Sequence, residues 1–396
     1  MAAFAGAKIA ESAPSELPQA YYVHSEDPAL KALLGVNHEF NGVFSAELTG
    51  TELALLKRLG VKTEPVQLRN ISRNHKCGDG ICQGFENANS CPSDCSLGGV
   101  EPTPTPTPEP SSRSCTPDNQ KPYGITMVNG GSGGAGVKVA VLDTGVKQGH
   151  LDLVNRIVNC TSKVTHHSAD SKDCEDAHGH GTHTSGTVLA DAGSDGKGIM
   201  GVAPEASLMA IKVCDRRGWC FGDDVAAGIR YAADNGANII SMSLGGDSAD
   251  PQELAAVDYA VGKGVLVVAA AGNDGPSDGS IDYPGAYIKV AAAGAINSGK
   301  SVPSWSSRGV NDGDYIVEEK EVEFATPGVS VESTTKDGCY GYSSGTSMAT
   351  PHVAGLAAKL WKGSAGQTRS FLQSISADVW TTGDDTATGF GLPISP

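Results

Sequence analysis

From about residue 115 onward, continuous apolar runs alternate with amphipathic stretches. The apolar runs are VKVAVLD, LMAIKV, NIISMSL and VLVVAAAG, and they have the pattern of parallel strands that are covered on both faces. Stretches such as DDVAAGIRYAADNG and PQELAAVDYAVGKG lie between them and have the spacing of helices. This alternation predicts a doubly wound α/β sheet with right-handed crossovers. Sites in such sheets lie beyond the carboxyl ends of the strands, where Asp143 and Asn273 are expected.

The residues before this region have a different pattern. In residues 1–76, AYYVHS and EFNGVFSAEL alternate apolar and polar positions as half-buried strands do, and ELALLKRLG is a short amphipathic helix that ends at Gly60. A last strand is expected around VKTEPVQL. Residues 77–95 form a compact module with four cysteines, and residues 96–114 hold a Pro/Thr linker that favours an extended polyproline conformation. We therefore expect a small αβ unit, a cysteine module, a linker and one large domain over residues 115–396.

Charge and cysteine content limit the possible partners and the compartment. The net charge of −16 repels phosphate backbones and anionic membranes, so we expect no nucleic-acid or membrane partner. No stretch approaches the roughly 18 apolar residues of a membrane span. Ten cysteines, an even number, indicate disulfides and therefore a secreted, extracellular protein. The first residues show no clear signal peptide, and we expect that a signal was removed and replaced by a start methionine.

Three short motifs carry the groups of a nucleophilic hydrolase. DTG, HGTH and GTSMATP contain Asp143, His180 and Ser347. A serine hydroxyl needs an adjacent imidazole to take its proton, and the imidazole needs a buried carboxylate to fix its tautomer. Ser347 opens a run that is expected to form a buried helix, whose positive end favours a nucleophile. The amide of Asn273 is expected to donate to the oxyanion together with the backbone N–H of Ser347.

Some of these residues allow other interpretations. Aspartic proteases also use DTG, but they need a second DTG in a matching lobe, which this chain lacks. His178, His180 and His183 could hold zinc. The neighbouring GTSMATP favours the hydrolase instead, and His183 is then expected to support the site without taking part in the chemistry. His166 and His167 are expected to be exposed loop residues.

Five segments resemble, in order, the motif set of the subtilases, the subtilisin-like serine proteases. They are VKVAVLDTG, HGHGTHTSGT, SMSLGG, VVAAAGNDG and SSGTSMATPHVAG, and they cover most of residues 121–362. The resemblance implies a three-layer α/β fold with a mostly parallel central sheet. It also implies a serine endopeptidase with the triad and the oxyanion asparagine named above. The segment FNGVFSAELTGTELALLKRLGV is similar to the family's inhibitory propeptide, which implies a ferredoxin-like α+β domain and a zymogen.

The resemblance also implies where the substrate binds. Gly218 and its neighbours would form a strand that pairs with the substrate backbone. Asp282 would lie at the floor of the primary specificity pocket, with Asp274 near its rim, and would favour Lys or Arg as the residue before the cleaved bond (P1). Alternatively, Asp282 points to solvent or binds a cation. The residues expected to line the pocket are Ser243, Leu244, Gly245, Gly246, Ala270, Ala271 and Gly272.

Structural calcium is a further implication. Asp152 stands where the family has a calcium ligand, and the loop ADAGSDGKGI stands at the family's calcium loop. Calcium takes about six to eight oxygen ligands, which acids and glycine-freed carbonyls supply. The expected ligands are Asn119, Asp152, Asp191 and Asp195.

The cysteines of the large domain are expected to form three pairs. These are Cys214–Cys220, Cys160–Cys174 and, from the two that remain, Cys115–Cys339. The module at 77–95 would hold two disulfides in an exported chain, with calcium as a possible addition, or zinc in the cytosol.

The combined hypothesis is a self-processing zymogen. The last strand of the first section would lie in the active-site cleft, and the chain would cut itself between Gln67 and Lys76. Protein and peptide substrates, an intramolecular inhibitor and a monomer are expected. An inactive subtilase-shaped binding protein is the first alternative, but no member of the catalytic set is missing. A metallohydrolase is the second, and chelation would inactivate it at once.

Overall fold

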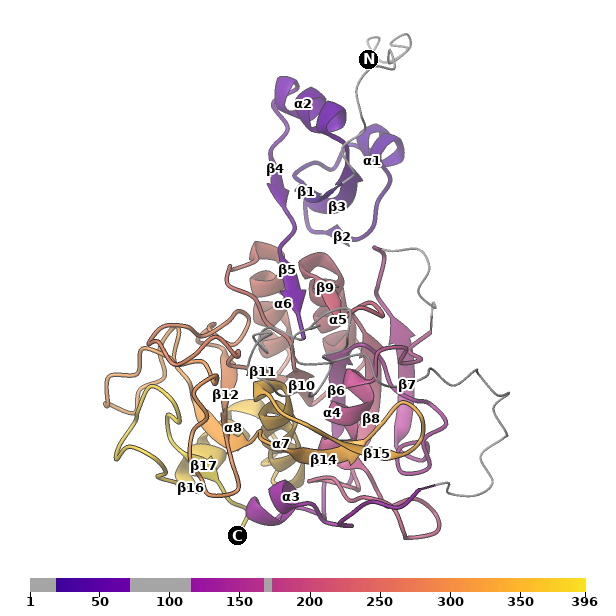
Figure 1. Ribbon diagram of the computed structural model, residues 1–396. Coiled ribbons are helices and arrows are strands. Elements are labelled where there is room, and N and C mark those ends of the chain that lie inside the picture. Colours follow the sequence, from indigo (N-terminus) through magenta and orange to yellow (C-terminus); the bar gives the residue numbers. More distant parts are fainter. Residues whose placement is uncertain (1–18, 72–114, 167–172) are drawn as a thin grey trace, which may run out of the picture. The chain divides into compact units, whose positions relative to one another are not determined.

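The computed structural model describes residues 19–71, 115–166 and 173–396 and divides into two compact units, Met1–Val66 and Gln67–Pro396 (Figure 1). The cysteine module, the linker and His167 lie outside the described residues. The first unit ends before Gln67 because the backbone of Gln67–Ile71 hydrogen-bonds to the second unit's own strands and loops.

The first unit is an antiparallel sheet with two helices. Its elements are β1 (Gln19–Val23), α1 (Pro28–Leu34), β2 (Glu39–Phe40), β3 (Val43–Leu48), α2 (Gly50–Arg58) and β4 (Thr63–Pro65). The strand order β2-β3-β1-β4, with this βαββαβ sequence, is the ferredoxin-like topology. Leu30, Phe44 and Leu56 meet in its core. Thr49 and Glu52 form a capping box that begins α2.

The second unit is built on seven parallel strands. They are β6 (Lys138–Asp143), β7 (Ile157–Ser162), β8 (Ser207–Lys212), β10 (Ile239–Met242), β11 (Leu266–Ala270), β12 (Val290–Ile296) and β13 (Phe324–Pro327). The order across the sheet is β13-β12-β11-β10-β6-β8-β7. The four apolar runs of the sequence are β6, β8, β10 and β11, so the predicted strands are confirmed. Three two-stranded sheets accompany this sheet in the described residues. They pair β5 (Leu68–Asn70) with β9 (Trp219–Phe221), β14 (Val331–Thr334) with β15 (Tyr340–Ser343), and β16 (Ser376–Ala377) with β17 (Leu392–Pro393).

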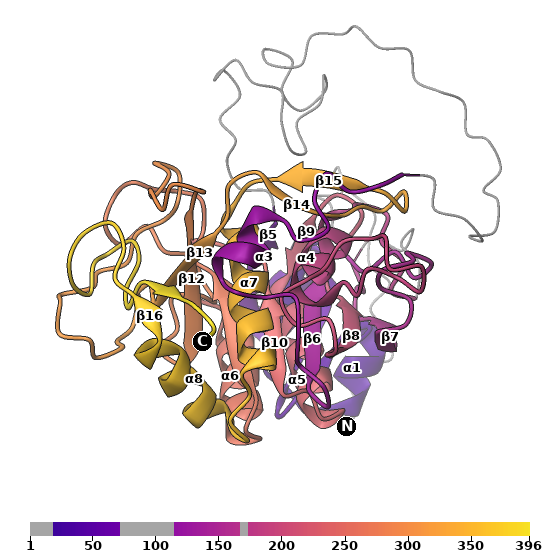
Figure 2. The same ribbon diagram turned by 90° about the horizontal axis from the view of Figure 1, so that it is seen from below.

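Helices cover both faces of this sheet. They are α3 (Tyr123–Met127), α4 (His180–Leu189), α5 (Gly222–Asp234), α6 (Pro251–Gly262), α7 (Thr346–Lys359) and α8 (Ala365–Ser374). The paired helices α5 and α6 lie on one face, and α4 and α7 pack together on the other (Figure 2). Helix α7 is buried from its first residue to Ala358, which explains its Ala/Gly-rich sequence. The three-layer α/β prediction is confirmed.

All three expected disulfides of the second unit are present. Cys214 pairs with Cys220, Cys160 with Cys174, and Cys115 with Cys339. The last of these joins residues 224 positions apart and ties the segment that begins at Cys115 to the loop between β14 and β15.

The expectation that His166 is exposed is wrong. Its side chain is buried, and Nε2 lies 3.0 Å from each carboxylate oxygen of Asp223. The imidazole also stacks on Phe221, with ring centroids 4.0 Å apart. Both partners come from a segment more than 50 positions later, so the local sequence gave no sign of this burial.

Within the residues that the structure describes, none of the helices has the length and apolar character that a membrane crossing requires.

A buried ion pair joins α8 to the sheet and gives a stability prediction. The carboxylate of Glu323 is almost fully buried and accepts hydrogen bonds from Arg369 at 2.7–2.9 Å and from Gln373 at 2.7 Å. Arg369→Leu leaves this carboxylate without its cation, so we expect the free energy of unfolding to fall by about 3 kcal/mol. Urea denaturation followed by circular dichroism measures the change. Lys289→Leu, which removes a surface pair with Asp258, is the control and should cost less than about 1 kcal/mol; equal losses would contradict the prediction.

Candidate active site

Asp143 ends strand β6 at the carboxyl edge of the sheet, as predicted. It is fully buried, and two neighbours orient its carboxylate. The backbone N–H of Thr144 donates to Oδ1 at 2.7 Å, and the hydroxyl of Thr184 donates to Oδ2 at 3.2 Å. A buried carboxylate held in this way is a fixed negative charge toward which another group can be oriented.

His180 is the first residue of α4 and lies directly against that carboxylate. Its Nδ1 is 2.8 Å from Oδ1 and 3.0 Å from Oδ2 of Asp143, and the ring is almost fully buried. The contact favours the tautomer with the proton on Nδ1. Nε2 is then the nitrogen that can act as a base.

Asp176, which sequence analysis missed, fixes the start of α4. Its carboxylate accepts hydrogen bonds from the side chains of Thr144 and Thr182 and from the backbone of Gly179. Burial raises the pKa of Asp176, but these hydrogen bonds outweigh it and the pKa is lowered. The carboxylate therefore stays charged and holds the turn that precedes His180. An acidic residue four positions before the histidine, just ahead of the helix, was the sequence signal for this role, because such residues often accept hydrogen bonds from the first N–H groups of a helix.

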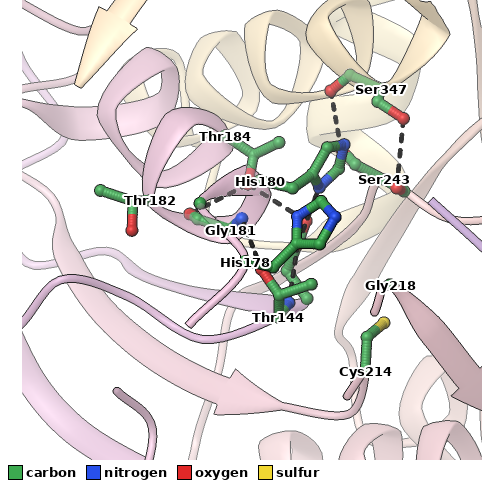
Figure 3. Close-up of polar contacts among 12 residues, drawn as sticks. Thr144, His178, His180, Gly181, Thr182, Thr184, Cys214, Gly218, Ser243 and Ser347 are labelled. Atoms are coloured by element: carbon green, nitrogen blue, oxygen red, sulfur yellow. Dashed lines mark hydrogen bonds and ion pairs between the residues drawn. The ribbon is translucent and has the colours of Figure 1, made fainter. Parts of the chain in front are cut away.

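Ser347 is the second residue of α7 and faces the imidazole. In Figure 3 the side chains of Ser347 and His180 point toward one another. The hydroxyl of Ser347 donates to the backbone oxygen of Ser243 at 3.2 Å, and the Ser243 hydroxyl donates to the backbone oxygen of Ser347 at 2.8 Å. The structure thus brings the three predicted residues together from β6, α4 and α7.

Asn273 lies beside the start of α7 with its amide oriented. Its Oδ1 accepts from the backbone N–H of Thr346 at 2.9 Å and from the Thr346 hydroxyl at 3.1 Å. Because the carbonyl side of the amide is occupied, the NH₂ side is the one that can donate to a ligand. Thr346 is a further positioning residue that the sequence did not single out, although it precedes the serine in GTSMATP.

The other two histidines of the zinc hypothesis behave as structural groups. His183 Nε2 contacts the backbone oxygen of Val331 at 3.0 Å. Burial lowers the pKa of both His178 and His183 to about 4, with a smaller contribution from His180. Among the described residues, no cluster at metal-ligand distances includes the three histidines.

A segment of the second unit's own chain runs through the expected substrate cleft. Strand β5 pairs antiparallel with β9 (Figure 1), and the N–H of Ile71 donates to the oxygen of Gly218 at 3.3 Å. On its other side, Asn70 exchanges hydrogen bonds of 2.9 and 3.2 Å with Gly245. Gly218 has φ +81°, and a Cβ there would lie 2.8 Å from the Ile71 side chain. The cleft therefore accepts a peptide as an added strand, bonded along both edges.

Asp282 is buried where the predicted pocket walls meet. Its Oδ2 would lie 2.7 Å from a Cβ placed on Gly245 or Gly272, so both glycines admit the carboxylate. Its backbone N–H donates to Ala271. The carboxylates of Asp247, Asp274 and Asp282 lie within 4.8 Å of one another. Of the remaining predicted lining residues, Ser243, Leu244 and Ala270 are buried along with Gly246.

Asp152, one of the four predicted calcium ligands, lies against the predicted calcium loop at residues 190–199. Asp152 is fully buried, and its Oδ2 accepts from the N–H of Ile199 and the hydroxyl of Tyr340, both at 2.8 Å. A Cβ on Gly198 would lie 2.0 Å from this carboxylate, so the loop backbone approaches it closely. Asp152 and loop carbonyls are the donor chemistry that calcium takes.

The other predicted ligands have other partners. Asp191 forms an ion pair with Arg156 at 2.8 Å, and Asp195 accepts from the N–H of Lys197 at 3.1 Å. The backbone N–H of Asn119 donates to Glu332. Asp152, Asp191 and Asp195 form no common carboxylate cluster among the described residues.

Comparison with known proteins agrees with this geometry. The family model described as "Subtilase family" matches residues 134–391. A subtilisin from Bacillus sp. (strain TA39) is 42% identical over 294 residues, which are 68% of this chain and 70% of that protein. Subtilisin DY from Bacillus licheniformis is 41% identical over 283 residues, 68% of this chain and 96% of its own length.

Solved structures show the same likeness. Sphericase has a TM-score of 0.68 and 44% identity, with 71% of this chain and 100% of that chain covered. The S41 psychrophilic protease has a TM-score of 0.66 and 41% identity, with 72% and 100% covered. With the family model and the relatives in agreement, this chain belongs to the subtilase family and is a serine endopeptidase.

Proposed function

We propose that the chain is the precursor of an extracellular endopeptidase that removes its own first unit. Ser347 is the nucleophile, His180 the general base and acid, Asp143 the orienting carboxylate and Asn273 the oxyanion donor. The observation that carries these roles is the placement of His180, with Nδ1 2.8 Å from Asp143 and Ser347 facing the ring (Figure 3). Three disulfides in the second unit favour an oxidising compartment.

The residues support a complete acyl-transfer sequence. His180 Nε2 takes the proton of the Ser347 hydroxyl as its oxygen attacks the substrate carbonyl, and Asp143 stabilises the imidazolium. The Asn273 NH₂ group and the Ser347 N–H stabilise the oxyanion. The imidazolium then gives its proton to the leaving amine, and a water molecule repeats the sequence on the acyl-enzyme.

Inhibition by the first part of the chain rests on segment 67–71. A strand that is hydrogen-bonded to both Gly218 and Gly245 excludes any other peptide from the same edges. The expected cut lies between Gln67 and Lys76, an interval that begins with this segment and continues into residues outside those described. The proposed mature form is a monomer that acts on proteins and peptides.

Replacement of the nucleophile tests the roles and the processing together. Ser347→Ala should stay at its full length, because no acyl-enzyme can form, and its peptidase activity should fall by about 10⁶-fold, a loss measured in a subtilisin. Mass spectrometry of the purified chain and a casein assay measure the two effects. Ser301→Ala, an exposed serine, is the control. Loss of the first unit from pure Ser347→Ala protein would contradict self-processing.

We further propose that Asp282 favours Lys or Arg at P1. The buried carboxylate, with Asp247 and Asp274 nearby, attracts a basic side chain.

In Asp282→Gly and the near-isosteric Asp282→Asn, the ratio of kcat/KM for Lys over Leu substrates should drop about tenfold. Asp312→Asn is the control, because it removes the same charge from an exposed residue 30 positions after Asp282. An unchanged ratio in both variants would refute the preference. A ratio that responds to chelation would indicate that the acids bind a cation instead.

A structural calcium ion is the third part of the proposal. Asp152 and carbonyls of the loop at residues 190–199 would hold it, and the ion would join this loop to the segment that carries Asp152. No step of the reaction involves it.

Chelation should therefore lower the melting temperature by about 5 °C while early activity persists. Asp152→Asn should abolish this difference, whereas Asp195→Asn, in the same loop, should retain it. Differential scanning calorimetry with calcium or a chelator makes the comparison on serine-inhibited protein. A melting temperature that ignores calcium, or immediate inactivation without unfolding, would refute a purely structural ion.

A further inference from the structure

The strand in the cleft carries a buried cation that the mechanism does not use. Arg69, in the middle of β5, is 1% exposed, and Glu253 in the first turn of α6 is 0% exposed. Nε and Nη2 of Arg69 donate to Oε2 of Glu253 at 3.1 and 2.6 Å. Oε1 of Glu253 is buried and accepts no hydrogen bond from the described residues. Among the described residues, Arg69 is the only ion-pair partner of that carboxylate.

Asp250 and Gly246 lie close to β5 on either side of the pair. Asp250, which caps α6, accepts the N–H of Gln67 at 3.2 Å. A Cβ on Gly246 would lie 3.0 Å from Arg69 Nη1 and 2.9 Å from the Leu68 oxygen, so this glycine lets the arginine pass.

The charged states of Arg69 and Glu253 stabilise each other. Burial raises the pKa of Glu253, and Arg69 only partly opposes that effect. Burial lowers the pKa of Arg69, but the charge of Glu253, its hydrogen bonds to Arg69 and the nearby Asp250 together outweigh this effect, and the net shift is upward. A neutral side chain in place of Arg69 would leave a buried carboxylate without its cation.

The register of the strand gives the number of residues between Arg69 and the position that faces the nucleophile. Asn70 pairs antiparallel with Gly245, so the position two residues later lies opposite Ser243. The backbone oxygen of Ser243 accepts the hydroxyl of Ser347. In a peptide bound in this register, three residues follow the arginine before the bond that faces Ser347. The arginine is therefore the fourth residue before that bond. In this chain's own sequence that bond follows Ser72, which is outside the described residues but inside the expected processing interval.

We propose that Glu253 makes the enzyme select substrates with an arginine as the fourth residue before the cleaved bond (P4). The proposal rests on the proposed function, because it takes segment 67–71 as a substrate mimic. Arginine satisfies Glu253 through two N–H groups at once, whereas lysine offers a single ammonium centre. A leucine at this position would leave the buried carboxylate without a cation. Such a site discriminates strongly against side chains that have no N–H donors for the carboxylate.

Peptide substrates measure the preference directly. The mature wild-type enzyme is given acetyl-Xaa-Asn-Ile-Ser peptides followed by a fluorogenic leaving group, with Arg, Lys, Leu or Glu as Xaa. We expect kcat/KM to be about 10- to 100-fold higher for Arg than for Leu, and lowest for Glu. In Glu253→Gln the Arg/Leu ratio should approach one, and in Glu253→Leu it should invert.

Two controls keep the result interpretable. Asp258→Asn removes an exposed acid from the same helix and should leave the ratio unchanged. The absolute rate on the Leu peptide shows that each Glu253 variant is folded, because loss of the carboxylate should leave this rate unchanged or raise it. If the mature wild-type chain cuts neither casein nor any of these peptides, the proposed function fails. If it cuts casein but none of the peptides, only the selection of arginine is overturned. If they are cut with Leu as good as Arg, or if Glu253→Gln keeps the wild-type ratio, only the selection of arginine is overturned.

The pH dependence of the same ratio is a second readout. Because burial raises the pKa of Glu253, the carboxyl becomes neutral at a higher pH than an exposed glutamate does. The Arg/Leu ratio should therefore decline as the pH falls through that pKa, and it should be flat with pH in Glu253→Gln. An effect of pH on the catalytic step itself is common to both substrates and cancels in the ratio.

Discussion

The contact between Asp143 and His180 is the constraint on which the rest of the site depends. It requires the end of a central strand and the start of a helix to meet within hydrogen-bond distance, with both groups removed from water. That approach is possible because a Cβ on Gly181 would lie 2.2 Å from the oxygen of Gly145, so these backbones touch. Asp176 then holds the turn before the imidazole. A buried charge pair is stable only when its remaining hydrogen bonds are made, and Thr144 and Thr184 make them.

The parallel sheet supplies the other groups because its strands end on one edge. Asp143 ends β6, the segment with Ser243 and Gly245 follows β10, and Asn273 follows β11. These three strands are neighbours in the order β11-β10-β6. Helix α7, which comes later in the chain, packs against the same three strands and carries Ser347 at its start. The nucleophile, oxyanion donor and cleft edge thus share one rigid support, which is what transition-state stabilisation without reorganisation requires.

Local patterns predicted what local residues determine. Apolar runs located four adjacent strands of the sheet, β11, β10, β6 and β8. The motifs located Asp143, His180 and Ser347, because each motif combines its functional group with the glycines that it needs. Long-range contacts could not be predicted in this way. The burial of His166 depends on Asp223, and the engagement of Asp191 depends on Arg156, which lies on a different segment. Sequence analysis did not single out Glu253, because its partner Arg69 is 184 residues away in the chain.

Glu253 and the acidic group around Asp282 together suggest how one cleft can serve both inhibition and selection. Both place acidic groups along the cleft in which β5 lies, in a chain whose net charge is −16. Long-range attraction of that sign favours basic peptides in general and is weakened by salt. A buried carboxylate behaves differently, because it discriminates through the cost of leaving it unpaired, which salt screens little. If segment 67–71 is the enzyme's first substrate, its arginine secures the inhibitory strand before the cut by the same contact that later selects a foreign peptide. Inhibitor affinity and substrate preference would then change together whenever Glu253 changes.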